Sequence, residues 1–114
     1  MANLIVTFGA ASELKHGVPS GRGLSVLAGS GVRTELIPIS AGSEPGQLTA
    51  AGADQVVVLY AESNCWVAIG DGPVAAVPVM DSDGSGYEAV HFIPAETRIP
   101  LIVKPAEAVA VIAA

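Results

Sequence analysis

The second half of this sequence is a series of short apolar runs separated by turns that contain glycine or proline. The runs are residues 66–70, 92–95, 99–103 and 108–113. Each run is shorter than a typical helix, and valine and isoleucine, which favour strands, are common in them. A chain interrupted this often buries its apolar residues by pairing short strands. The sequence therefore predicts an all-β fold, either an antiparallel β-sandwich or a small barrel.

The same reasoning places strands along the whole chain. The expected strands are residues 3–8, 32–39, 55–62, 65–70, 74–80, 89–93, 99–103 and 109–113. In the first of them, alternation puts Leu4, Val6 and Phe8 on one face. The short gap at Ser63-Asn64 predicts a hairpin between the strands on either side of it. The polar stretch 40–52, rich in glycine, serine and proline, is expected to form no more than a loop with a turn.

The expected core is thin, because alanine and valine supply most of the apolar content and aromatic residues are only 4% of the chain. Small side chains bury little area each, so contacts with other subunits could add stability. Trp66 is expected to be a buried anchor rather than an exposed stacking platform. The residues predicted to contribute most of the core are Val57, Leu59, Trp66, Val67, Ile69, Phe92, Leu101 and Val103.

Residues 10–31 differ from the rest of the chain, because glycine and serine recur through them. A loop longer than about 15 residues is uncommon in a compact domain and is usually functional. A purely solvated loop would not need apolar side chains, yet this one carries several. We predict an extended loop or arm that reaches a neighbouring subunit, with a possible short strand at residues 23–28. The candidate interaction residues are Leu14, Val18, Leu24, Val26 and Leu27.

Composition restricts the partners. The 114 residues fit one domain, residues 1–114. Charged residues make up 14% of the chain, against about 25% in a typical protein, which predicts apolar surface available to a partner. The net charge is −6 and the five cations are scattered, so neither nucleic acid nor an anionic membrane is an expected partner. No apolar run approaches the roughly 20 residues that span a bilayer, and no signal peptide is expected.

One acidic segment has the outline of a calcium loop. Asp81 and Asp83 with Gly86 match the start of an EF-hand loop, but its last ligand position holds Phe92 instead of a glutamate. A polar turn is the preferred interpretation, and a weak Ca²⁺ site stays the alternative. Most other acids, Asp54 among them, also lie in expected turns, where solvation is the usual state.

Nucleophilic and zinc chemistry have equally little support. Cys65 could act as a nucleophile beside a histidine, and Cys65, His16 and His91 could form a zinc set. Their spacing matches no paired zinc motif, and Cys65 begins an apolar strand, which is typical of a buried structural cysteine. The sequence therefore predicts no enzyme, no cofactor, and no catalytic, cofactor-binding or metal-binding residues.

An ordered pattern runs through the C-terminal half. It consists of Trp66-Val67-Ala68-Ile69-Gly70, Pro73-Val74-Ala75, Phe92-Ile93-Pro94-Ala95, Pro100-Leu101-Ile102-Val103-Lys104-Pro105 and Val109-Ala110-Val111-Ile112-Ala113. In this order and style the chain resembles small β-rich virion structural proteins of tailed bacteriophages. The resemblance implies a non-enzymatic, multi-copy component of the virion, first of all a capsid decoration (cement) protein. Its partners would then be copies of itself and the major capsid protein.

Two alternatives stay open. The first, within the same resemblance, is a component of the head–tail connection or of the tail. The second belongs to a different class, a carbohydrate-binding β-sandwich module that uses Trp66, Tyr60 or Tyr87 as a stacking platform. A monomer that binds sugar would favour the module, whereas an oligomer that adsorbs to capsids would favour the virion protein.

Overall fold

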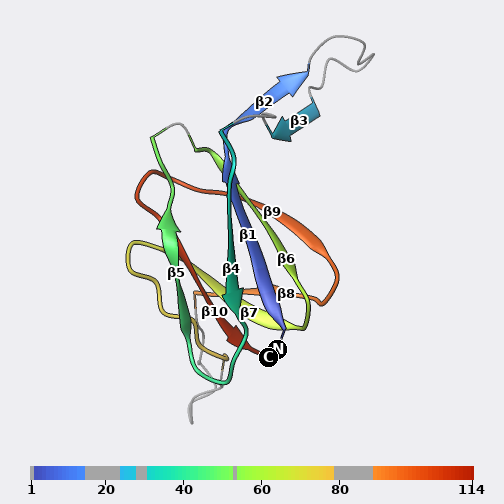
Figure 1. Cartoon of the computed structure of the whole chain (residues 1–114), viewed down its shortest axis with the longest axis vertical. Coiled ribbons are helices and arrows are strands. Elements are labelled where there is room, and N and C mark those ends of the chain that lie inside the picture. The colour runs from blue at the N-terminus through green and yellow to red at the C-terminus, as the bar shows by residue number, and fades with distance from the viewer. Residues whose placement is uncertain (1, 15–23, 28–30, 53, 79–88) are drawn as a thin grey trace, which may run out of the picture.

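The computed structural model describes residues 2–14, 24–27, 31–52, 54–78 and 89–114, with the backbone alone for 11–14 and 24–27. Its strands are β1 (Asn3–Gly9), β2 (Ala11–Leu14), β3 (Leu24–Leu27), β4 (Arg33–Pro38), β5 (Glu44–Thr49), β6 (Val56–Ala61), β7 (Cys65–Gly70), β8 (His91–Ile93), β9 (Arg98–Ile102) and β10 (Ala108–Ala113). The first sheet has the order β4-β1-β6-β9 and the second β5-β10-β7-β8. The two pack together as a sandwich (Figure 1), which confirms the all-β antiparallel prediction.

The core lies between the two sheets. Leu4, Val6 and Phe8 of β1 are fully buried, as their alternation predicts. From the second sheet, Val67 of β7 and Val111 of β10 point into the same interior. The buried cluster is made of Leu4, Val6, Phe8, Ile37, Ile39, Ala50, Val57, Leu59, Ala61, Cys65, Val67, Ile93, Val103, Val109 and Val111.

The predicted core is correct in part. Val57, Leu59, Val67 and Val103 are buried, and Ile69 and Leu101 pack against the cluster while partly exposed. The two aromatic predictions were wrong, because Trp66 is only half-buried and Phe92 is exposed. Side chains alternate along a strand, and the smaller Cys65 and Val67 take the inward positions of β7, so Trp66 points outward.

The hairpin predicted across Ser63-Asn64 was also wrong. β6 pairs with β1 and β9 in the first sheet, whereas β7 pairs with β10 and β8 in the second. The short connection therefore carries the chain from one sheet to the other. Buried Leu59 and buried Val67 can then face the core from opposite sides, which a flat hairpin would not allow.

Residues 44–49, expected as loop, form edge strand β5 beside β10. The strand alternates between exposed and half-buried positions and contains Pro45 and Gly46, so it lacks an apolar strand pattern. A side chain at position 46 would be crowded, since a Cβ there would lie 2.9 Å from Ile37 Cδ1 and 3.0 Å from the Val109 carbonyl oxygen. The close approach of β4 and β5 at this point closes one side of the sandwich.

The strand expected at residues 74–80 is not present over 74–78, and residues 79 and 80 lie outside the described part of the chain. Instead, the segment after β7 packs on the outer side of the second sheet. Ala75 is buried there against Ala68 and Ala110. Its backbone N–H donates a 3.0 Å hydrogen bond to Ser43 Oγ, which fixes the segment to the end of β5.

The expected arm at residues 10–31 contains a two-stranded ribbon. β1 leads through Ala10 into β2, and β3 pairs antiparallel with β2 before the chain returns to β4. Residues 23–28, where a short strand or turn is expected, contain strand β3. The ribbon projects beyond the sandwich at the top of Figure 1. The molecule is accordingly elongated, at 52 × 30 × 26 Å, and its radius of gyration of 15.6 Å exceeds the roughly 13 Å of a compact chain of this length.

Candidate interaction surface

The first sheet turns one apolar face away from the core. We call it the open face and define it by the outward residues Ile5, Thr7, Thr34, Leu36, Val58, Tyr60, Arg98, Pro100 and Ile102. The strand register arranges most of them in two cross-strand rows. One row is Leu36, Ile5, Tyr60 and Arg98, and the next is Thr34, Thr7, Val58 and Pro100.

Large apolar side chains on the open face are exposed. Ile102 is 85% exposed and Leu36 is 62% exposed, at opposite edges of the sheet. Between them, Ile5 and Val58 are half-buried, and the Thr7 and Thr34 hydroxyls lie 3.1 Å apart. A single exposed leucine or isoleucine is ordinary, but an apolar surface that spans a whole sheet is typical of a contact site.

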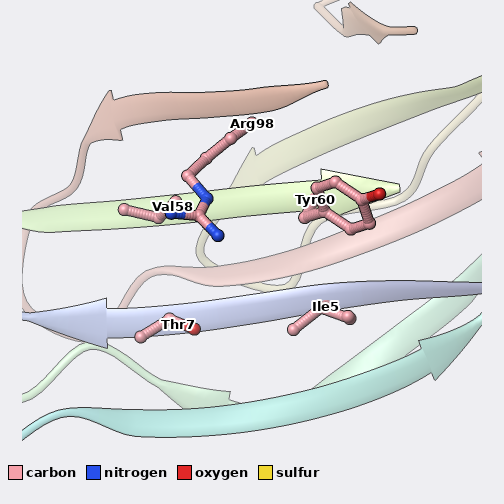
Figure 2. Close-up of a pocket in the computed structure, with 5 residues that line it drawn as sticks. All are labelled: Ile5, Thr7, Val58, Tyr60 and Arg98. Atoms are coloured by element: carbon pink, nitrogen blue, oxygen red, sulfur yellow. The ribbon is translucent and has the colours of Figure 1, made fainter. Parts of the chain in front are cut away.

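A shallow hollow of about 420 Å³ lies in the middle of the open face, lined by Ile5, Thr7, Val58, Tyr60 and Arg98. Figure 2 shows the Arg98 side chain reaching over β6 beside Val58, with Tyr60 farther along the same strand. Arg98 forms no ion pair with any residue that the structure describes. The hollow thus combines apolar walls with an unpaired positive charge, in a chain whose net charge is −6.

The edges of both sheets carry proline. Edge strands β4, β5 and β9 contain Pro38, Pro45 and Pro100, and Pro94 follows edge strand β8. Proline has no backbone N–H to donate, and its presence at sheet edges hinders the addition of a further strand. A face of the sandwich is therefore better suited to protein contact than its edges are.

Glu35 closes the side of the sandwich where β4 and β5 meet. Its carboxylate accepts hydrogen bonds from the backbone N–H groups of Gln47 and Leu48, the latter at 3.0 Å. These donors belong to the free edge of β5. The glutamate thus occupies backbone groups that could otherwise pair with another strand.

The second sheet has a smaller apolar area on its own outer side. The register aligns Phe92, Trp66 and Ile112 in one row across β8, β7 and β10. The rings of Trp66 and Phe92 are 5.1 Å apart at their centroids and inclined by 59°, a favourable tilted arrangement. Trp66 is therefore partly covered by Phe92, while Phe92 is 45% exposed.

A partly buried ion pair, with Asp54 buried and Arg33 partly exposed, lies where β4 begins, on the ribbon side of the sandwich. The Arg33 guanidinium donates to the Asp54 carboxylate and, at 2.9 Å, to the Thr49 carbonyl oxygen. It also lies over the Phe8 ring, 5.7 Å from its centroid. Asp54 accepts a second hydrogen bond from the Ala51 N–H at 2.7 Å and is only 6% exposed. The expectation of a solvated Asp54 was therefore wrong, because its partner Arg33 is distant in sequence.

The residues considered for nucleophilic or metal chemistry are not assembled in the described part of the chain. Cys65 is fully buried, and burial raises the pKa of its thiol to about 11. His91 lies exposed on β8. His16, Asp81 and Asp83 lie outside the described residues, so the calcium alternative stays untested. Within the described residues, no three histidine, cysteine, aspartate or glutamate side chains are grouped as metal ligands would be.

Four of the five candidate interaction residues belong to the ribbon. Leu14 ends β2, directly opposite Leu24, and Val26 and Leu27 follow on β3. Val18 lies outside the described residues. Their contact with a neighbouring subunit stays a prediction, but the ribbon's position beyond the sandwich makes its backbone accessible to such a neighbour (Figure 1). On the open face lies Tyr60, which the sequence suggested only as a stacking platform for a sugar.

Comparison with known proteins found no family model, no curated protein and no solved structure that matches this chain. In the described residues there is no helix of the length and apolarity that crossing a membrane requires. The surfaces described above are therefore the basis on which a function can be proposed.

Proposed function

We propose that this chain is a non-enzymatic structural protein of a tailed-phage virion, present in many copies, and most simply a capsid decoration protein on the major capsid protein. The open face carries this proposal. It offers Leu36 and Ile102 to a partner on a rigid sheet whose edges are blocked by proline. Such a face suits packing against another folded surface, which is how a cement protein stabilises a shell.

The ribbon supports the same role from a second direction. It extends the long axis of the molecule beyond the sandwich, so it can contact a subunit that the sandwich does not touch (Figure 1). The apolar residues Leu14, Leu24 and Val26 in its strands would gain from burial there. The net charge of −6 favours a protein partner over packaged nucleic acid.

A head–tail or tail component would use the same surfaces. One feature of the hollow favours a different class of function, which is carbohydrate binding. Tyr60 and Arg98 lie side by side across β6 and β9, and an aromatic ring beside a hydrogen-bond donor can hold a sugar. Trp66 suits this role less, because Phe92 covers part of it. Tyr87 lies outside the described residues.

The test is reconstitution on particles. The purified chain is added to particles of the encoding phage that lack it, and co-sedimentation is measured. The wild-type chain is expected to bind, and Ile102→Glu, which places a charge on the open face, is expected to reduce binding. Lys104→Glu, an exposed change just after β9, is the matched control and should bind normally. Failure of the wild-type chain to bind, with its absence from native particles by mass spectrometry, would refute the proposal.

Deletion of residues 14–21 tests the ribbon separately. We expect it to weaken particle binding or self-association more than it lowers the melting temperature, since the deletion leaves both four-stranded sheets intact. Equal losses of binding and stability, or no loss of either, would contradict an interaction role for the ribbon. A glycan array with the wild-type chain and Tyr60→Ala covers the carbohydrate alternative.

A further inference from the structure

The turn that follows β7 is an exposed acidic and apolar projection. Asp71 is exposed and Val74 is 75% exposed. Gly72 has φ +64°, a left-handed conformation that glycine adopts readily and that shapes the turn. Ala75, which follows Val74, is buried, and its backbone N–H donates a hydrogen bond to Ser43. The turn is therefore fixed on that side. We call residues 71–74 the acidic turn.

The hollow on the open face has the complementary chemistry. Its walls include Ile5 and Val58, which suit an apolar side chain the size of valine, and Arg98 supplies a positive charge beside them. Neither Arg98 nor Asp71 has an ion pair or side-chain hydrogen bond to any residue that the structure describes. Each is thus free to pair with an opposite charge on another molecule.

One molecule cannot bring these two features together. The acidic turn adjoins Ala75, which packs on the outer side of the second sheet against Ala68 and Ala110. The hollow lies on the outer side of the first sheet, across the full thickness of the sandwich. The turn of one copy can instead reach the hollow of another. The first copy then keeps a free hollow and the second a free turn, and each of these can bind a further copy.

We propose that the hollow receives the acidic turn of a second copy of this chain, with Val74 against Ile5 and Val58 and with Asp71 paired to Arg98. Such a contact joins two different surfaces, so it repeats until it closes into a ring or continues as a filament. The occupant is a second copy because this chain carries both complementary halves, the hollow with Arg98 and the turn with Asp71 and Val74. The inference rests on the proposed multi-copy role and states how the copies meet.

The test is a charge exchange measured by sedimentation velocity over a range of protein concentrations. The wild-type chain is expected to self-associate, and Arg98→Glu or Asp71→Arg is each expected to weaken the association by about tenfold or more. Mixing the two single variants should restore assembly, because each then offers a charge that the other lacks. Lys104→Glu is the matched control for Arg98→Glu, since Lys104 is an exposed cation that does not line the hollow and its reversal should have no effect.

Three results would overturn the inference, two of them from the wild-type chain and the charge-reversal variants. The first is a wild-type chain that stays monomeric at every concentration, and the second is self-association that neither charge variant changes. Particle binding in the reconstitution assay would leave the proposed structural role standing in both cases. Thermal unfolding checks that each variant is folded, and Arg98→Gln, which removes the charge without reversing it, replaces Arg98→Glu if that variant unfolds. An Arg98→Gln chain that assembles like the wild type would likewise overturn the inference.

Discussion

The two faces of the first sheet are built from the same strands and similar residues but lie in opposite surroundings. In β6, Val57 and Leu59 are fully buried, whereas their neighbours Val58 and Tyr60 line the hollow on the open face. In β9, Leu101 packs against the core and Ile102 is 85% exposed. Apolar character alone therefore does not mark the interior of this protein. The inner face stabilises the fold, and the outer face is available for assembly.

Removing a large inward side chain is expected to have the largest effect on the free energy of unfolding. Phe8→Ala should lower the free energy of unfolding by about 3–5 kcal/mol, because it leaves a cavity in a thin core. Chemical denaturation measures the loss. The matched change on the other face of the sheet, Val58→Thr, should cost no more than about 0.5 kcal/mol. Similar costs for the two variants would mean that the open face is also covered within the monomer.

The second largest effect is expected at the ion pair between Arg33 and the buried Asp54. Asp54→Ala should cost about 2–3 kcal/mol, since it removes the acceptor for both Arg33 and the Ala51 N–H. Glu96→Ala, at an exposed glutamate that the proposed contact does not use, is the control and should change thermal stability little. A stable Asp54→Ala chain would show that the pair contributes little to anchoring residues 49–54 against β4.

Trp66 tests whether the outer side of the second sheet contributes as much to stability as the core does. It lies outside the core and is partly covered by Phe92, so Trp66→Ala should cost about 1–2 kcal/mol, less than Phe8→Ala. Thermal unfolding followed by circular dichroism measures the difference. A loss as large as that of Phe8→Ala would place Trp66 among the main core residues after all.

The buried thiol is expected to affect stability only at high pH, and to have no effect near neutral pH. Burial raises the pKa of Cys65 to about 11 from its ordinary value of 9.0. Between these values the unfolded chain has lost the thiol proton and the folded chain has kept it. The free energy of unfolding should therefore fall as the pH rises from 9 to 11, by about 1.4 kcal/mol per unit at most. Other groups also titrate in this range, so the wild type is compared with Cys65→Ala, and parallel pH profiles would contradict the prediction.

Local pattern determined much of the fold. Alternation in residues 3–8 predicted which face of β1 is buried, and turn residues bounded most of the later strands. Position at the start of an apolar run predicted the burial of Cys65. These features depend on the spacing of side chains along a strand, which can be read directly from the sequence.

The arrangement of the strands and the candidate surface depended on long-range contacts. Continuous valines at 56–58 fit either orientation of β6, so their pattern could not separate core from open face. Strand β5 is recognisable only beside β10, and Asp54 is buried only because Arg33 lies next to it. The hollow likewise needs Ile5, Val58 and Arg98 from three strands. That this chain forms short antiparallel strands follows from local features alone, since backbone preference and side-chain period are local. Which strands share a sheet, and which apolar face stays exposed, depends on pairing between residues far apart in the chain and becomes visible only in the fold.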